Sequence, residues 1–200
     1  MALYQDVSDY LKKWESFTPV AKWDVNAYRL GYGSDTITLP DGTYRKVKAG
    51  DKTTKELADK DLQRRIKLEF EPKVRNKVGE PYYTNLQDSA KVALISVAYN
   101  YGNLTKPAIV DAARSGNPKK IADAIVTSTV NDNKGTKDYN GLRRRRMDEA
   151  NYILSNLKNM TALGVKETIK KAGQNPISTT FITAGLIFGT YLLIKATTKK

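Results

Sequence analysis

The sequence predicts an α+β fold that is mostly helical, with one small antiparallel sheet near the N-terminus and a single transmembrane helix at the C-terminus. Three observations support this prediction. Apolar residues recur at helical spacing through most of residues 1–160. A stretch of strand-like alternation interrupts them between residues 17 and 49. A run without charged residues follows at residues 177–194.

The N-terminal third predicts a helix, a small sheet and a second helix. The first helix has apolar positions three or four residues apart, at Leu3, Val7, Tyr10, Leu11 and Trp14. From Phe17 to about Ala49, Tyr, Trp, Thr and Ile alternate with Gly, and the turn sequence Pro40-Asp41-Gly42 indicates a hairpin or meander. Thr53 or Thr54 can cap the next helix. Its apolar stripe is Leu57, Leu62, Ile66 and Phe70.

The rest of the first 160 residues predicts four more helices. A long apolar helix over residues 86–101 is stopped by Gly102-Asn103. Shorter helices are expected at residues 108–115 and 118–127. A polar loop over residues 131–140 then leads into a final helix at about residues 141–159. Residues 1–160 are therefore expected to form one domain.

The C-terminal apolar run has the length of a membrane span. As a helix, residues 177–194 would extend about 27 Å, against a hydrocarbon core of about 30 Å. Lysines flank the run on both sides, so a buried core helix is the weaker alternative and the orientation stays open. We expect a linker at 161–175, a transmembrane helix at 176–195 and a short basic tail at 196–200. Gly185 and Gly189 are spaced for pairing with a second helix.

The composition restricts the chemistry. The chain has 34 Lys and Arg against 21 Asp and Glu, a net charge of +13 that favours polyanionic partners such as nucleic acid, anionic lipid or the bacterial wall. It has no Cys and no His. Catalysis by Ser-His-Asp or Cys-His, and an ordinary zinc site, are therefore excluded. Acid–base chemistry would have to use carboxylates, or Lys or Tyr.

Two carboxylates near the N-terminus fit that requirement. Glu15 ends the first helix between Trp14 and Phe17, and apolar surroundings favour the protonated form that a general acid needs. Asp24 begins the sheet region, where it would stay ionised. Glycoside hydrolysis uses this division of labour. The alternative is that Glu15 is a surface acid paired with Lys12 or Lys22.

Four segments in order resemble the phage-type lysozymes, glycoside hydrolase family 24. They cover roughly residues 5 to 158. The first is Glu15 followed nine residues later by Asp24 and then by the strand Gly31-Tyr32-Gly33. The others are residues 51–61, the apolar helix 92–103 and the segment Gly-Leu-Arg-Arg-Arg-Arg-Met-Asp-Glu at 141–149.

The resemblance implies a two-lobed, lysozyme-like fold with a cleft, and hydrolysis of the β-1,4 bond between N-acetylmuramic acid and N-acetylglucosamine in bacterial peptidoglycan. Glu15 would be the general acid, and Asp24 would act on the attacking water or stabilise charge on the sugar, with inversion at the sugar. No metal or cofactor is implied. A phage or prophage source is implied as well. Separately, the C-terminal apolar run suggests that the enzyme is held in a membrane, either the virion membrane for infection or the host inner membrane for lysis.

The chain departs from the family pattern beside Asp24. Arg29 occupies the place of a Thr that helps to position the water, and a guanidinium accepts no hydrogen bond. The water could be held instead by Ser34, Asp35 or Thr36, while Arg29 could pair with Asp24 or Asp35 and keep it ionised. Ser34 also replaces a frequent His. The residues expected to contact sugars are Tyr32, Tyr99, Asn100 and Asn103.

Three other functions are weighed against hydrolysis. A lytic transglycosylase would use Glu15 as both acid and base, and would need no bound water. A structural virion membrane protein could keep the fold without turnover. The run Arg143–Arg146 suggests nucleic-acid binding, but Arg145 and Glu149 stand four residues apart on a helix and are expected to pair. We therefore do not expect nucleic acid to be the main partner.

Overall fold

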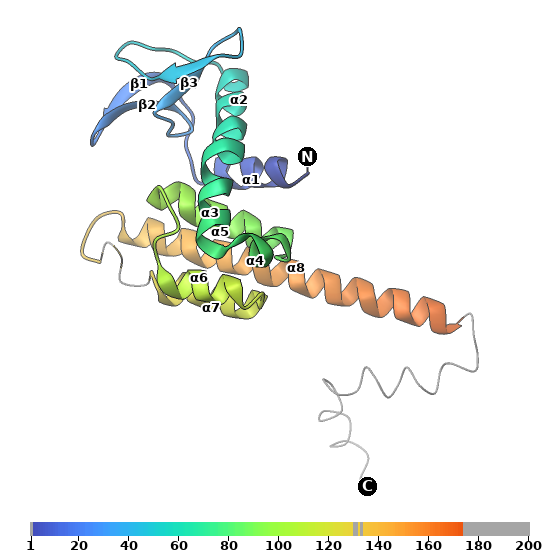
Figure 1. Cartoon of the computed structure of the whole chain (residues 1–200). Helices are drawn as coiled ribbons and strands as arrows, with labels where there is room; N and C mark the ends of the chain where they lie inside the picture. The colour runs from blue at the N-terminus through green and yellow to red at the C-terminus, as the bar shows by residue number, and fades with distance from the viewer. Residues whose placement is uncertain (1, 130–131, 133, 174–200) are drawn as a thin grey trace. The chain divides into compact units, whose positions relative to one another are not determined.

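The computed structural model describes residues 2–129, 132 and 134–173 (Figure 1). The chain divides into two compact units, Met1–Leu154 and Ser155–Lys200. The first unit is mixed α and β, as expected, and it contains all the candidate site residues. Buried apolar residues form two clusters in it, a large one among the helices and a small one beside the strands made of Leu30, Ile37 and Val47.

The N-terminal part contains a helix and two short β-ladders. Its elements are α1 (Ala2–Lys12), β1 (Thr18–Asp24), β2 (Ala27–Gly31), β3 (Thr36–Thr38) and β4 (Tyr44–Lys46). β1 pairs with β2 and β3 pairs with β4, both antiparallel, so the predicted sheet consists of two two-stranded sheets. In the first ladder Trp23 lies opposite Tyr28, which places Asp24 at the end of the strand beside a tight turn.

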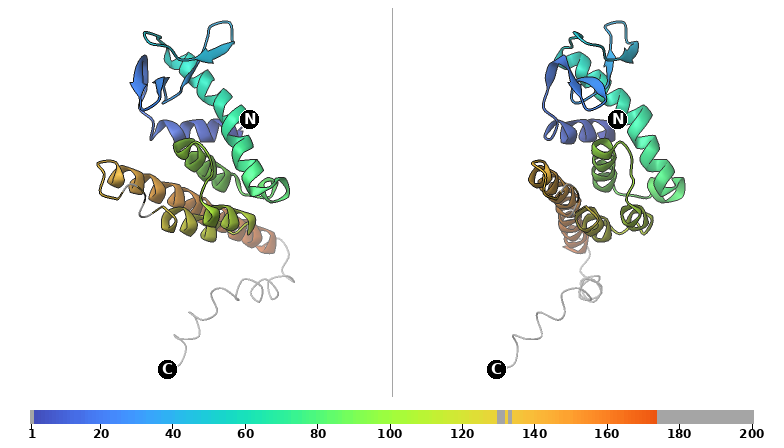
Figure 2. Two further views of the ribbon diagram at one scale, coloured as in Figure 1. Left: turned by 60° about the vertical axis from the view of Figure 1, so that its left-hand side comes forward. Right: turned by 90° about the vertical axis from the view of Figure 1, so that its left-hand side faces the viewer.

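A continuous helical stretch joins the strands to the remaining helices. It consists of α2 (Lys55–Arg65), the π-helix η1 (Ile66–Phe70) and α3 (Glu71–Val78). Thr54, rather than Thr53, caps α2 by accepting a hydrogen bond from the Leu57 amide at 3.3 Å. Figure 2 shows from two sides that the strands lie against the beginning of α2, whereas the other helices gather near α3.

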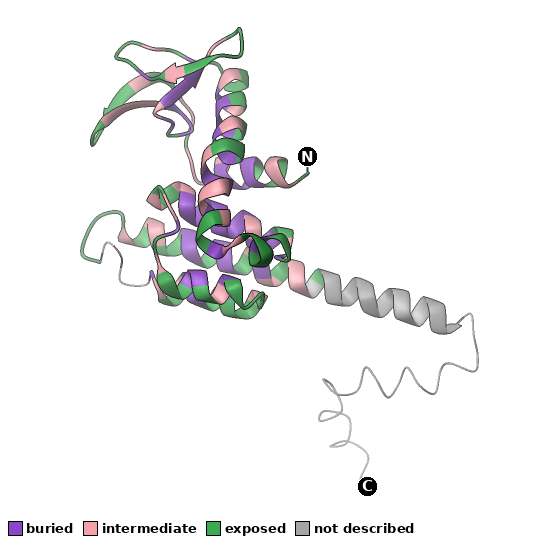
Figure 3. Cartoon of the chain, viewed as in Figure 1, coloured by how far each residue is buried: buried purple, intermediate pink, exposed green. Residues whose placement is uncertain are grey.

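The remaining elements are helices. They are α4 (Glu80–Thr84), α5 (Asp88–Tyr101), α6 (Pro107–Arg114), α7 (Pro118–Thr127) and α8 (Tyr139–Gly173), of which the part up to Leu154 belongs to the first unit. The middle of α5 is buried, which explains why its sequence is apolar on every face (Figure 3). α5 ends at Gly102, whose φ of +79° is the left-handed conformation that glycine adopts readily.

The C-terminal predictions fall largely beyond this description. α8 is longer than the predicted helix 141–159 and extends into the segment expected to be a linker. The expected transmembrane helix at 176–195, with Gly185 and Gly189, and the tail at 196–200 lie outside the described residues. Within the part of the chain that is described, no helix combines the length and apolar character needed to cross a bilayer.

Candidate active site

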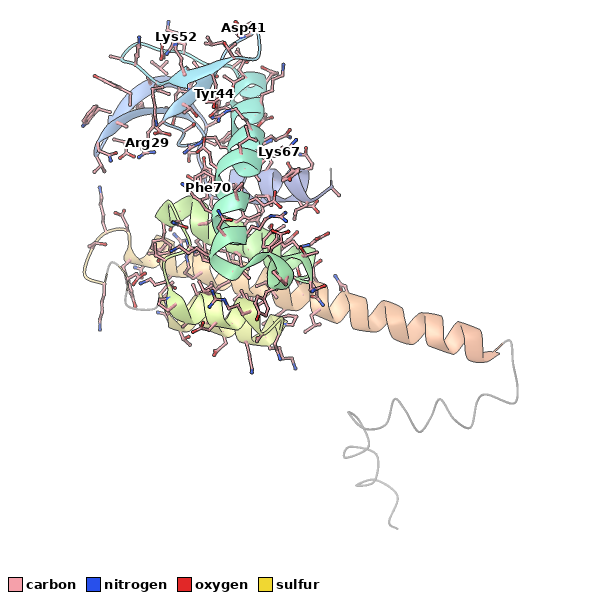
Figure 4. All side chains as sticks on the ribbon, viewed as in Figure 1. Arg29, Asp41, Tyr44, Lys52, Lys67 and Phe70 are labelled. Atoms are coloured by element: carbon pink, nitrogen blue, oxygen red, sulfur yellow. The ribbon has the colours of Figure 1, made fainter. Side chains whose placement is uncertain are left out.

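A cleft of about 480 Å³ lies between the strands and the end of α5. Its lining comes from both ends of the unit and comprises Glu15, Asp24, Arg29, Gly33, Asp35, Arg65, Phe70, Lys73, Tyr99, Asn100, Tyr101 and Gly102. Figure 4 labels Arg29 on the strands and Phe70 at the end of η1. A smaller hollow of about 200 Å³ shares Glu15, Asp24, Arg29 and Gly33 with the cleft. The two carboxylates thus border both spaces, and an extended polymer could occupy each of them.

Glu15 is held at the end of α1. Its amide donates to the Leu11 carbonyl at 3.0 Å, which continues the helical turn beyond Lys12. Its Oε1 forms an ion pair with Arg145 Nη1 at 2.7 Å, and the Glu15 side chain is 22% exposed. A Cβ at Gly33 would lie 3.5 Å from Oε2, so the backbone at Gly33 runs alongside the second oxygen. The expected alternative partner Lys12 pairs with Asp59 instead, at 2.7 Å.

Arg145 belongs to a buried cluster of charged residues on α5 and α8. Its Nε lies 3.4 Å from Glu149 Oε1, the expected pair four residues apart. Ser96 Oγ donates to the same carboxylate oxygen at 2.6 Å, and Arg146 Nη1 lies 2.8 Å from the other. Complete burial raises the pKa of Glu149, whereas Arg146, Ser96 and Arg145 oppose that rise. Two of the four consecutive arginines are therefore internal.

Asp24 stands at the end of β1 with Arg29 as its ionic partner. Arg29 Nε lies 3.0 Å from Asp24 Oδ2, so the expected pairing of Arg29 with Asp24 is confirmed. The Asp24 side chain is 59% exposed, more than twice the fraction for Glu15. The turn that follows contains Val25 at a φ of +52°, a conformation that costs a β-branched residue free energy.

A family model described as Phage lysozyme matches residues 12–149, which include the whole network from Glu15 to Glu149. The chain belongs to the phage lysozyme family. No curated protein matches it in a sequence comparison. Membership of the phage lysozyme family supports a peptidoglycan hydrolase activity and implies peptidoglycan as the substrate.

In this phage lysozyme family member, Asp35 is a third carboxylate in the cleft, and it is firmly paired. Lys46 Nζ lies 2.5 Å from its Oδ2, and Arg65 Nη2 lies 3.2 Å from its Oδ1. Burial by itself would raise the pKa of Asp35, but the hydrogen bond from Lys46 and the charges of Arg65, Lys46 and Arg29 lower it below the usual value. Asp35 is therefore a fixed negative charge.

Ser34 and Thr36, the other residues expected to hold a water, are buried beside α2 and do not line the cleft. Ser34 Oγ donates to Asp61 Oδ2 at 2.6 Å, and Thr36 Oγ1 donates to the same carboxylate at 3.1 Å. Thr38 Oγ1 donates to Asp61 Oδ1 at 3.0 Å. Their hydroxyls are used to join the strands to α2, because a buried carboxylate needs several donors.

Two of the four expected sugar contacts line the cleft, Tyr99 and Asn100. The Tyr99 hydroxyl donates to the Tyr32 carbonyl at 2.5 Å, and burial raises the Tyr99 pKa. Tyr32 itself is buried, with its ring 5.7 Å from that of Phe17. Asn103 accepts a hydrogen bond from the Leu104 amide at 2.8 Å after α5 ends. Tyr32 and Asn103 do not line the cleft.

Sequence reasoning did not find several residues of the cleft wall. The sequence places Phe70 only in the apolar stripe of its helix, whereas in the structure its ring centroid lies 4.7 Å from that of Tyr99. Arg65 and Lys73 lie on the same helical stretch, and nothing in their spacing distinguishes them from surface residues. Among the described residues, no group of three or more acidic side chains could hold a metal ion.

Proposed function

We propose that the protein is a muramidase of glycoside hydrolase family 24, which hydrolyses the β-1,4 bond between N-acetylmuramic acid and N-acetylglucosamine. The observation that carries the proposal is the common border of the two hollows, where Glu15 and Asp24 both lie. A glycan strand occupying both hollows would place one of its glycosidic bonds at these two carboxyls.

Glu15 is proposed as the general acid. Arg145 holds its Oε1, and Oε2 lies beside Gly33, so Oε2 is the oxygen proposed to give a proton to the leaving sugar. Asp24 is proposed as the carboxylate that directs water to the sugar or stabilises its developing positive charge. The cations of the cleft wall, Arg65 and Lys73, suit an anionic wall polymer.

We further propose that residues 176–195 tether the enzyme to a membrane, either in the virion for infection or in the host inner membrane for lysis. The support is the uncharged run of 177–194 with lysines on both sides. Pairing of two such helices through Gly185 and Gly189 is part of this proposal.

The catalytic proposal is tested by release of soluble fragments from purified Gram-negative peptidoglycan by the full chain. The wild type is expected to release fragments, and Glu15→Gln is expected to lose most of that activity while remaining folded. Asp123→Asn is the matched control, because Asp123 is an exposed acid on α7 away from the cleft. A wild type that releases nothing from several wall types would favour the non-catalytic structural relative.

A lytic transglycosylase is the second candidate, and one observation favours it. By the resemblance, Arg29 would occupy the place of the water-positioning Thr, and a guanidinium carries donors only, so it offers no acceptor to a water. The ends of the released fragments decide between the two reactions. Reducing ends support hydrolysis, and 1,6-anhydro ends support transglycosylation.

The tether is tested by membrane fractionation of the full chain, followed by salt and alkaline washes. The wild type is expected to stay in the membrane fraction. The double variant Leu186→Lys, Ile187→Lys is expected to wash off, because each lysine at a helix centre costs about 3 kcal/mol of insertion free energy. Leu186→Ile is the control. Release of the wild type by washing would reject the tether.

A further inference from the structure

We propose that Arg29 is a positioning residue that fixes the Asp24 carboxylate relative to Glu15. This inference rests on the function proposed above and adds a residue to its machinery. The role is argued from this chain's own contacts at Arg29.

Arg29 contacts three oxygen atoms in the same neighbourhood. Its Nε forms an ion pair with Asp24 Oδ2 at 3.0 Å, without hydrogen-bond geometry in the described part of the chain. Its Nη2 donates to Asn26 Oδ1 at 3.4 Å, and its Nη1 donates to the Gly33 carbonyl at 3.3 Å. Arg29 thus spans the β1–β2 turn on one side and the segment after β2 on the other. A guanidinium can do this because its donors lie in one rigid plane.

Asp24 needs such a partner because little else holds its side chain. It is 59% exposed, and among the described residues Arg29 is its only ionic partner. The backbone beside it is strained, since Val25 has a φ of +52°, and Val25 is 88% exposed, so packing of its side chain does little to hold the turn. An exposed carboxylate on a strained turn would sample several positions without the guanidinium.

The hydrogen bond from Arg29 to the Gly33 carbonyl connects the Arg29–Asp24 pair to Glu15. Gly33 has a φ of +77°, and a Cβ there would lie 3.5 Å from Glu15 Oε2. The carbonyl that accepts from Arg29 therefore belongs to the residue that runs alongside Glu15. In this way one side chain links Asp24 to the backbone next to Glu15, and the separation of the two carboxyls depends on it.

This role differs from that of a threonine at the same place. A threonine hydroxyl can accept a hydrogen bond and hold a water, but it cannot reach three separate oxygens. Replacing Arg29 by threonine is therefore expected to remove the link and to lower activity. If Arg29 has no positioning role, Arg29→Thr should instead be as active as the wild type.

The experiment measures kcat and KM of the full chain on fluorescently labelled peptidoglycan for Arg29→Gln, Arg29→Lys and Arg29→Thr. We expect kcat to fall about 10- to 100-fold in the Gln and Thr variants with little change in KM, because a misplaced catalytic group costs rate more than binding. Arg29→Lys, which keeps the charge, should recover part of kcat. Lys120→Gln removes an exposed cation on α7, away from the cleft, and controls for net charge.

A second measurement separates positioning from a structural role. If Arg29 acts through Asp24, Arg29→Gln should reduce kcat much less in an Asp24→Asn background than in the wild type. A structural role would instead lower the melting temperature and reduce kcat equally in both backgrounds. Equal reduction, or an Arg29→Thr variant as active as the wild type, would overturn the inference while leaving the muramidase proposal intact. An inactive wild type would overturn both.

Discussion

Two buried clusters of charged residues lie near the cleft, and they are built differently. In the strand-side cluster, Asp61 accepts from Ser34, Thr36, Thr38 and Arg64, and none of these side-chain atoms lacks a hydrogen bond. In the helix-side cluster, Glu149 meets Arg145 and Arg146, and several of its buried atoms have no hydrogen bond within the described part of the chain. These atoms are Arg145 Nε, Arg146 Nε and Nη1, and Glu149 Oε2.

This difference in hydrogen bonding indicates which of the two clusters supports the candidate active site. The Asp61 cluster has its donors matched to one carboxylate, so it fastens the strands to α2. In the described part of the chain the Glu149 cluster contains buried donors without a hydrogen bond, and a different donor of the same cluster, Arg145 Nη1, reaches Glu15 Oε1 at 2.7 Å. We therefore expect the strand-side cluster to govern stability, whereas the helix-side cluster governs stability and activity together.

The largest effect is expected when the helix-side cluster loses its carboxylate. Glu149→Gln should lower the free energy of unfolding by about 3 to 5 kcal/mol, because buried Arg146 loses the carboxylate with which it pairs and Arg145 keeps Glu15 but loses Glu149. Activity per folded molecule should fall as well, since Arg145 is released from its anchor. Urea unfolding and peptidoglycan release measure the two effects. Glu80→Gln, an exposed partner of Arg75, is the control and should change stability by less than about 1 kcal/mol.

The matching change on the strand side should be smaller and confined to stability. Asp61→Asn keeps one acceptor oxygen but presents an amide to the surrounding donors. The expected loss is about 2 kcal/mol in the free energy of unfolding, with activity per folded molecule retained. Loss of activity comparable with that of Glu149→Gln would show that the two clusters do not differ as described.

The ion pair between Arg45 and Asp51, near the strands and less buried than Asp61, allows a test of how stability depends on pH. Hydrogen bonds from Arg45, helped by the Lys48 amide, lower the pKa of Asp51 to about 2 against the opposing effect of burial. Because this pKa is depressed, the stabilisation is fully present above the unfolded-state value near 4 and disappears as the pH falls through about 2. The pair is partly exposed, so solvent screening makes the stabilisation smaller than the depressed pKa alone would give.

Urea unfolding between pH 5 and pH 2 measures this contribution. The wild type should lose more stability over that range than Arg45→Gln, in which the depression of the Asp51 pKa is removed. Equal slopes in the two proteins would mean that the Arg45–Asp51 contact contributes nothing in solution.

The smallest effect is expected at Ser34, and it tests the earlier hypothesis that this hydroxyl positions water. Ser34→Ala removes one donor from Asp61 and one acceptor from Arg65 Nη1, at 3.1 Å. It should cost about 1 kcal/mol of unfolding free energy and leave kcat unchanged. A large fall in kcat without destabilisation would return Ser34 to the catalytic machinery.

Much of the fold could be predicted from local pattern. Helix α1 was indicated by apolar residues on one face, such as Val7 and Leu11, and α5 by a continuous apolar stretch. Both patterns are visible in the sequence because a helix buried on one face, or on all faces, needs apolar residues at those positions. The turn after Asp24 was less readable. It uses Val25 in a left-handed conformation, where turn chemistry would favour Gly or Asn.

The candidate site could be predicted only in part, for a physical reason. Glu15 and Asp24 lie close in sequence and carried a spacing that resembles a known family, so they were accessible to sequence reasoning. Ser34 and Thr36 carried the same kind of hydroxyl as a water-positioning residue. Whether a hydroxyl faces a cleft or a buried carboxylate depends on which element packs against it, and here α2 places Asp61 there.

By itself, the sequence determined the class of fold, the absence of His and Cys chemistry, the two candidate carboxylates and an apolar C-terminal run. Only the tertiary structure decided that Arg145 pairs with Glu15, which lies 130 residues away in the sequence. It also decided that Arg29 contacts Asp24 and Gly33, and that the strand hydroxyl of Ser34 donates to Asp61. Composition and periodicity are local properties of the chain. Ion pairs and hydrogen bonds between distant segments are set by packing, which no local pattern encodes.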